Sequence, residues 1–259
     1  MLLRINLFVL LIASVLCFLA VIEVGFRLGR REKELRDDGT GAHVGALQTA
    51  LLGLLALLLG FTFAMSVSRF EIRKALVAEE ANAIGATFIR ARLLPEPHRQ
   101  GVRHLLNEYV AARLAFNEDR DERALMAAEA ATFRMQRELW AHTVGAAAQE
   151  PTSEPVALFI QSVNEAIDKR EAIRAARDNY VPETVLFLLF AVTAVSLAFI
   201  GYGSGLTGRR RFVPNAVFAL LIALVLTIIL DLDRPRRGLI RVSQGSMIRL
   251  KAKMDQSQP

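Results

Sequence analysis

The sequence predicts an all-α, polytopic membrane protein with four transmembrane helices in two hairpins and a helical-bundle insert between the second and third helices. The first observation behind this fold class is a set of four nearly uncharged apolar runs, each close to the ~20 residues that a helix needs to cross a bilayer. They lie at about 5–26, 44–67, 185–206 and 213–230. The second observation is that apolar residues between the second and third runs recur at the spacing of amphipathic helices. We therefore expect four regions: a first transmembrane hairpin (1–67), an extramembrane helical insert (68–182), a second transmembrane hairpin (183–232) and a basic C-terminal tail (233–259).

The charge of the chain is the third observation. The formal net charge is +6, which in a soluble protein would raise nucleic acid as a partner. Here the basic residues cluster beside the apolar runs, where lipid headgroups and membrane topology account for them. We expect membrane lipid, and no nucleic acid, as a partner. The Lys and Arg counts of the two possible orientations are nearly equal, so charge alone does not decide which loops are cytoplasmic.

The first apolar run begins after a single basic residue, as a secretory signal does. It is longer than a typical signal core and no A-x-A cleavage site follows, so we expect a retained span. Its Cys17 is the one cysteine of the chain and has no partner for a disulfide. Glu23 lies near the charged end of the run and has two interpretations. It either pairs with Arg27 at the membrane interface or lines an ion pathway.

The second apolar run begins a helix that we expect to continue unbroken from Val44 to Arg92, until Leu94-Pro95 ends it. Such a helix would be ~70 Å long and would project from the membrane. Its membrane half carries a stripe of small residues that permits the close approach of another helix: Thr49, Gly53, Ala56, Gly60, Ala64 and Ser68. The stripe serves either packing within one subunit or a pore in an oligomer. In a pore, the candidates for a hydrophobic constriction are Phe61, Phe63 and Met65.

The insert is predicted to form a helical bundle of roughly 115 residues, enough for a core of its own. The polar half of the long helix contributes one apolar face: Phe70, Val77, Ala81, Ile84 and Phe88. Three further helices are expected at 97–116, 121–144 and 156–179. Residues 145–155 are expected to form a loop, with Thr152 or Ser153 as the N-cap of the last helix.

The third and fourth runs end in unusual residues. Gly-Tyr-Gly at 201–203 ends a span, whereas a potassium filter is a loop between spans that Thr-Val precedes, so we do not expect a filter. The small residues of the third run predict helix packing: Ala191, Ala194, Ala198, Gly201 and Gly205. Asp231 and Asp233 end the fourth run, where acids oppose the helix dipole. They either pair with the arginines that follow or form an ion vestibule.

The sequence carries no signature of catalysis or of cofactor binding. A Gly-rich phosphate loop, an H-x-x-x-H or paired-cysteine metal spacing and a G-x-S-x-G motif are all missing from it. Its histidines are scattered and are predicted to be surface or core residues rather than ligands: His43, His98, His104 and His142. We therefore expect no enzyme, no cofactor and no metal site.

Three segments together resemble one family of membrane proteins. They are LLGFTFAMSVSRFEIRKALVAEEANAIGATFIRARLLPEP at 58–97, NYVPETV at 179–185 and ILDLDRPRRGLIRVSQ at 229–244. These segments resemble the bestrophin-like family of bacteria and plants, whose function is uncharacterised. The EEANAIG and DLDRPRRGLIRVSQ strings are the most specific part of the likeness.

The resemblance implies a function through the similar layout of true bestrophins, which are pentameric ion channels with a pore lined by the second span. It implies a homo-oligomer in the inner membrane that conducts inorganic ions, with a cytoplasmic helical-bundle insert and cytoplasmic N- and C-termini. The pore-lining candidates are then Thr49, Gly53, Ala56, Gly60, Phe61, Phe63 and Met65, and the acids that bias ion entry are Glu23, Asp231 and Asp233. The calcium-binding carboxylate run of animal bestrophins is not evident. The alternative is a membrane-anchored scaffold or sensor whose helical insert binds a partner protein.

Overall fold

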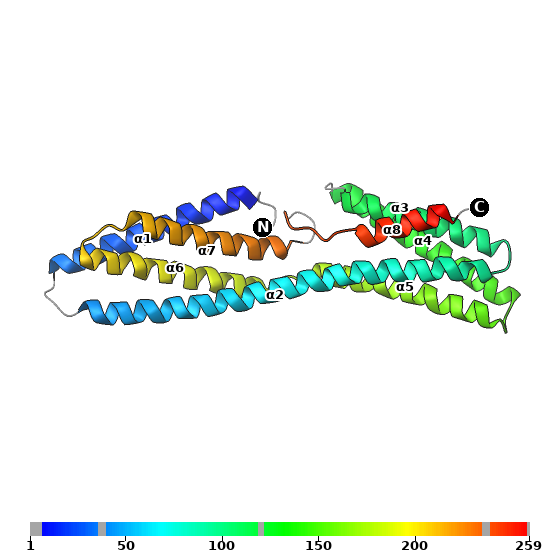
Figure 1. Cartoon of the computed structure of the whole chain (residues 1–259), viewed down its shortest axis with the longest axis horizontal. Helices are drawn as coiled ribbons and strands as arrows, with labels where there is room; N and C mark the ends of the chain where they lie inside the picture. The colour runs from blue at the N-terminus through cyan, green and yellow to red at the C-terminus, as the bar shows by residue number, and fades with distance from the viewer. Residues whose placement is uncertain (1–6, 36–39, 119–121, 235–238, 258–259) are drawn as a thin grey trace. The chain divides into compact units, whose positions relative to one another are not determined.

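A computed structural model describes residues 7–35, 40–118, 122–234 and 239–257, and in these ranges the regular structure is entirely helical. Two compact units result. Described residues 7–69, 180–234 and 239–240 form the first, which we call the apolar unit, and 70–179 and 241–257 form the second, the polar unit. The helices in chain order are α1 (Leu7–Leu35), α2 (Thr40–Arg90), α3 (His98–Glu118), α4 (Glu122–Gln149), α5 (Glu154–Asp178), α6 (Glu183–Thr207), α7 (Phe212–Leu232) and α8 (Gly245–Gln256) (Figure 1).

Four helices among the described residues are long and apolar enough to cross a membrane, by length and composition. They are α1, the first half of α2, α6 and α7, which confirms the all-α fold with four spanning helices. The arrangement in two hairpins and the cytoplasmic side of the insert stay predictions. Residues 5–6 of the first expected span and 235–238 and 258–259 of the expected tail lie outside the described residues.

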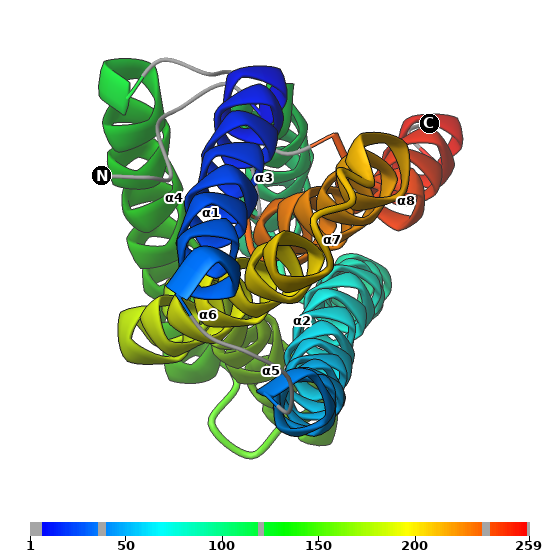
Figure 2. The same cartoon turned by 90° about the vertical axis from the view of Figure 1, so that its left-hand side faces the viewer.

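The tightest packing of the apolar unit is between α1 and α6, and α7 also lies against α1 (Figure 2). A Cβ atom on Gly25 would lie 2.1 Å from the carbonyl oxygen of Ala198, and one on Gly201 would lie 2.0 Å from that of Ile22. Glycine is required at both positions because the two backbones touch there. The prediction that the small residues of the third span serve helix packing is thus confirmed at Ala198 and Gly201. The partner helix, the first span, was not predicted.

The long second helix is continuous, as predicted. α2 runs from Thr40 to Arg90, a 3-10 turn follows at Ala91–Leu93, and Leu94 is extended before Pro95. The first helix is longer than its apolar run, because α1 continues through an arginine-rich segment to Leu35. Residues 28–35, which follow the apolar run, are therefore helical.

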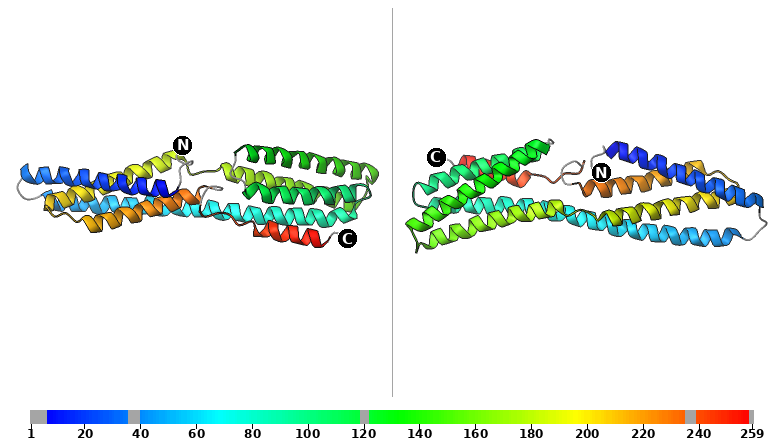
Figure 3. Two further views of the ribbon diagram at one scale, coloured as in Figure 1. Left: turned by 90° about the horizontal axis from the view of Figure 1, so that it is seen from above. Right: turned by 180° about the vertical axis from the view of Figure 1, so that it is seen from behind.

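The polar unit has its own core, as expected of the insert. The second half of α2 packs with α3, α4, α5 and α8 around a cluster that includes Ile84, Phe88, Leu106, Val110, Phe159 and Val163. Of the predicted stripe on α2, Val77, Ala81, Ile84 and Phe88 are buried. Residues 241–257 of the basic tail belong to this unit. They include α8, which lies against α3 and buries Met247 and Met254 (Figure 3).

The loop expected at 145–155 is shorter than predicted. α4 continues past Gly145 to Gln149. Gly145 is required for packing rather than for a turn, because a Cβ atom there would lie 2.4 Å from the ring of His98. Ser153 occupies the N-cap position of α5, but its side chain makes no capping hydrogen bond.

Candidate functional site

The membrane half of α2 presents its small-residue stripe away from the rest of the chain. Thr49, Gly53, Ala56 and Gly60 are all exposed. A Cβ atom added at Gly53 or Gly60 would meet no atom within 4 Å. Of the four spanning helices α2 is the least covered, since 17% of its most apolar stretch is buried in the chain, against 28–39% for the others. Packing within one subunit therefore does not explain this stripe.

The three large side chains expected at a constriction do not share one side of α2. Residues four apart in a helix lie ~40° apart around its axis, whereas residues two apart lie ~160° apart. Phe61 and Met65 thus share a side, together with Leu57, and Phe63 points nearly the opposite way from Phe61. Phe61 is 67% exposed and Phe63 41%. One side of α2 therefore carries Phe61 with Met65, and nearly the opposite side carries Phe63.

The opposite face of α2 fixes the helix to the apolar unit. Leu55 is buried in the core formed with α6 and α7. Ser66 is also buried, and the Ser196 hydroxyl of α6 donates to the carbonyl oxygen of Leu51 at 3.4 Å. The exposed stripe thus belongs to a helix whose other side is anchored.

Glu23 is bound to two arginines at the end of the spans. Its carboxylate accepts hydrogen bonds from Arg27 in α1 and from Arg210 in the turn between α6 and α7, both at 2.9 Å. The pair with Arg27 is the one that the sequence predicts. All three side chains are more than a third exposed, so the pairs contribute little to stability.

The two aspartates at the end of α7 are buried and bind backbone groups. The Asp231 carboxylate accepts the N–H groups of Leu239 and Ile240 at 2.8 Å each. Both oxygens of Asp233 lie 3.1 Å from the N–H nitrogen of Val181, just before α6. The Arg69 guanidinium of α2 lies 3.8 Å from the Asp233 carboxylate. These acids determine how the chain enters α6 and leaves α7.

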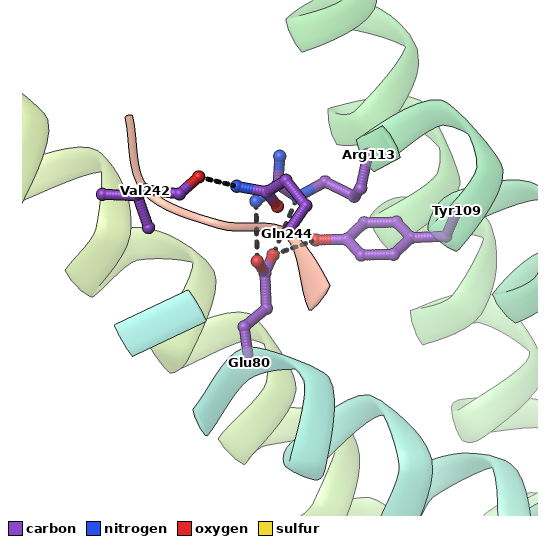
Figure 4. Close-up of polar contacts among 5 residues, drawn as sticks. All are labelled: Glu80, Tyr109, Arg113, Val242 and Gln244. Carbon is purple, nitrogen blue, oxygen red and sulfur yellow. Dashed lines mark hydrogen bonds and ion pairs between the residues drawn. The ribbon is translucent and has the colours of Figure 1, made fainter. Parts of the chain in front are cut away.

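The polar unit contains a buried ion pair that the sequence did not reveal. Glu80 of α2 and Arg113 of α3 are 0% and 1% exposed. Arg113 donates from Nε at 2.9 Å and from its terminal nitrogen at 2.6 Å, one bond to each carboxylate oxygen of Glu80 (Figure 4). The Tyr109 hydroxyl donates to the same carboxylate at 3.4 Å. Burial, together with the charge of Glu80, raises the pKa of Tyr109, so this hydroxyl stays a neutral donor.

Two further polar side chains belong to the same part of the polar unit. Arg170 of α5 is buried, and burial together with the charge of Arg113 lowers its pKa. Gln244, in the segment that leads into α8, donates to the carbonyl oxygen of Val242 at 3.4 Å (Figure 4). Glu80 lies in the EEANAIG string, and Asp231, Asp233 and Gln244 lie in the DLDRPRRGLIRVSQ string. The buried acids Glu80, Asp231 and Asp233 therefore lie in the two strings that are most specific to the family resemblance.

A comparison with protein families gives a match to the bestrophin-like domain over residues 11–247. The chain belongs to the bestrophin-like family. A comparison with curated proteins gives no match.

Solved structures show the same fold. A crystal structure of a bacterial bestrophin homologue from Klebsiella pneumoniae, in a tyrosine-to-alanine variant, is 15% identical and has a TM-score of 0.67, with 94% of this chain and 97% of that one covered. An aspartate-to-alanine variant of the same homologue is 16% identical, with a TM-score of 0.67 and coverage of 95% and 99%. A membrane protein in a proline-to-alanine variant has a TM-score of 0.68 at 16% identity, with coverage of 96% and 99%.

This bestrophin-like protein is thus a multi-pass membrane protein with the bestrophin fold. Family membership and fold together support a channel-like role at the level of the family. The assignment of the exposed stripe of α2 to an ion pathway stays a prediction. The buried pair Glu80–Arg113 and the backbone contacts of Asp231 and Asp233 are what the sequence missed.

Proposed function

We propose that this bestrophin-like protein is an oligomeric ion channel of the inner membrane, with an ion pathway lined by the exposed face of α2. The observation that carries the proposal is the open space over Gly53 and Gly60 in the middle of a spanning helix. By family analogy we propose five subunits, with the insert and both termini in the cytoplasm.

The apolar unit has two kinds of glycine-containing helix face, one between α1 and α6 and one on α2. On α1 and α6, Gly25 and Gly201 let two backbones touch, which is the ordinary use of glycine in spanning helices. On α2, Gly53 and Gly60 have no atom of the described residues within 4 Å of an added Cβ. Lipid tails do not require small residues, since large apolar side chains contact them equally well. The exposed stripe therefore fits a pathway between the α2 helices of neighbouring subunits, where small side chains leave room for ions.

The constriction is proposed at Leu57, Phe61 and Met65, which share one side of α2. Leu57 and Phe61 are 56% and 67% exposed, so both side chains are available to a lumen. A ring of such side chains, one set from each subunit, narrows a pore and allows gating by dewetting. Phe63 is proposed to face a neighbouring helix instead.

The acids at the span ends have different proposed roles. Glu23 is partly exposed between Arg27 and Arg210, so it is the acid that can meet an ion directly. Asp231 and Asp233 are 3% and 2% exposed, so we propose that they affect ion entry by holding the backbone around them. Their direct role in a vestibule stays a prediction.

The experiment that tests the channel is the current across a planar bilayer that holds the purified protein under a salt gradient. A steady current that Gly60→Leu abolishes, while the oligomer on size exclusion is unchanged, supports the pore. The sign of the reversal potential then names the preferred ion. A folded, oligomeric protein that carries no current contradicts the proposal.

The scaffold alternative rests on a different observation. On α4 of the polar unit, Met126, Phe133, Trp140 and Val144 are 65%, 60%, 40% and 54% exposed. Their spacing of seven, seven and four residues puts them on one side of the helix. An exposed apolar face outside a span is typical of a surface that binds another protein. The scaffold is favoured if the protein carries no current in the bilayer and if it binds a partner protein that Phe133→Asp no longer binds.

A further inference from the structure

Two histidines that are far apart in sequence meet in the polar unit. His98 begins α3 and His142 lies in the last third of α4. Their Nδ1 atoms are 3.2 Å apart, and the rings are nearly perpendicular, at 75°, with centroids 5.5 Å apart. At this distance the Nδ1–H group of one ring donates a hydrogen bond to the Nδ1 atom of the other.

The pair is held by a reciprocal arrangement of glycines. A Cβ atom on Gly101 of α3 would lie 2.4 Å from the ring of His142, and one on Gly145 of α4 would lie 2.4 Å from the ring of His98. Each helix thus supplies one histidine and the glycine that makes room for the histidine of the other. The two rings are partly buried, and their positions follow from the close contact of α3 and α4.

The separation of the two nitrogens matches the ligands of one metal ion. Zinc binds histidine nitrogen at about 2.0–2.1 Å with tetrahedral geometry, so two nitrogens on one zinc ion lie about 3.3 Å apart. Neutral imidazole is the form that binds a metal. Burial and the neighbouring His98 lower the pKa of His142, in the direction of the neutral form.

We infer that His98 and His142 form a binding site for a divalent transition metal ion of the zinc type, which links α3 to α4. The ion takes the place of the hydrogen between the two Nδ1 atoms, and that hydrogen moves to Nε2 of the same ring. No proton is lost from the pair when both rings start neutral.

The remaining ligands come from water and from Glu138. Among the described residues no group of three or more histidine, cysteine, aspartate or glutamate side chains is gathered for a metal. Glu138 lies four residues before His142 on α4, the spacing at which two ligands share one side of a helix. Its side chain is exposed and its charge already acts on His142, so a rotation of the carboxylate can complete a third position.

The test is a zinc titration of the full-length protein in detergent, purified through a tag without histidine and stripped with a chelator. Isothermal titration is expected to give one zinc ion per chain. His98→Gln and His142→Gln are each expected to weaken binding at least about tenfold, and Glu138→Gln to weaken it less. His104→Gln is the matched control, because His104 also has a glutamate four residues away, Glu108, at 3.4 Å, but no second histidine. It is expected to bind zinc like the wild type.

A second measurement needs no variant and covers the case in which a histidine substitution unfolds the chain. Zinc is expected to protect His98 and His142, but not His104, from diethylpyrocarbonate, as read by mass spectrometry. The inference is overturned if zinc does not bind, if binding survives in a double variant of His98 and His142, or if zinc protects all three histidines equally.

Discussion

Both carboxylate oxygens of Asp233 lie 3.1 Å from the backbone nitrogen of Val181, so the end of α7 is hydrogen-bonded to the start of α6. Because Val181 is 2% exposed, solvent does not reach its N–H group to replace the carboxylate. Asp233, which the sequence suggested as an acid for ion entry, therefore connects the end of α7 to the start of α6.

Asp233→Ala is expected to destabilise the protein by about 1–3 kcal/mol, because the buried N–H group of Val181 loses its acceptor. Thermal unfolding of the purified protein measures this. Glu23→Gln is the control, and its melting temperature is expected to equal that of the wild type because Glu23 is partly exposed. A shifted reversal potential with an unchanged melting temperature in Asp233→Ala would instead assign Asp233 to the vestibule.

Arg113→Met is expected to cost about 3–5 kcal/mol of stability, since it leaves the Glu80 carboxylate buried without its partner. Combining it with Glu80→Gln is expected to recover part of the loss, which a double-mutant cycle on thermal or chemical unfolding measures. The adjacent residue supplies the matched control: Glu79 pairs with Lys169 at 2.7 Å on the surface, so Lys169→Met is expected to cost much less stability than Arg113→Met. If Arg113→Met and Lys169→Met lower the free energy of unfolding equally, a structural role for the buried pair is contradicted.

Gly201→Ala is expected to separate α1 from α6, because even a methyl group there would lie 2.0 Å from the carbonyl oxygen of Ile22. The melting temperature should fall, and detergent-extracted protein should aggregate. Gly60→Ala adds the same methyl group where no atom lies within 4 Å, and we expect an unchanged fold. A stable Gly201→Ala protein would show that the contact between these helices is looser than described.

The sequence predicted the spans and the exposed stripe because both depend on local composition and helical spacing. It could not predict that the glycines of α6 and α2 serve different purposes. Gly201 and Gly60 stand in similar stripes. Only the fold shows that Gly201 meets α1, whereas Gly60 meets none of the residues that the structure describes.

The buried Glu80 did leave a signal. It lies three residues after Val77 and four before Ile84, and so in the middle of the apolar stripe of α2, where a carboxylate requires a partner. The partner, Arg113, could not be found, because it comes from another helix 33 residues away. The pair of His98 and His142, which we expected to be isolated, was missed for the same reason.

Phe61→Ala is expected to change the single-channel conductance, because the side that it shares with Leu57 and Met65 is proposed to form the constriction. Phe63→Ala is the matched control. It removes the same ring from the same helix on nearly the opposite side, and its conductance should equal that of the wild type. The reverse result would move the constriction to the side of Phe63.

The central claim, that the exposed face of α2 lines the ion pathway, is tested most directly by cysteine accessibility during conduction. Cys17 is exposed, so the background is Cys17→Ser. Current is recorded while a charged methanethiosulfonate reagent is added to Gly53→Cys, Leu57→Cys and the buried position, Leu55→Cys, where the side chain is 2% exposed. We predict a rapid change of current at positions 53 and 57 and none at 55. The claim is contradicted if mass spectrometry shows that positions 53 and 57 are labelled and the current is nevertheless unchanged.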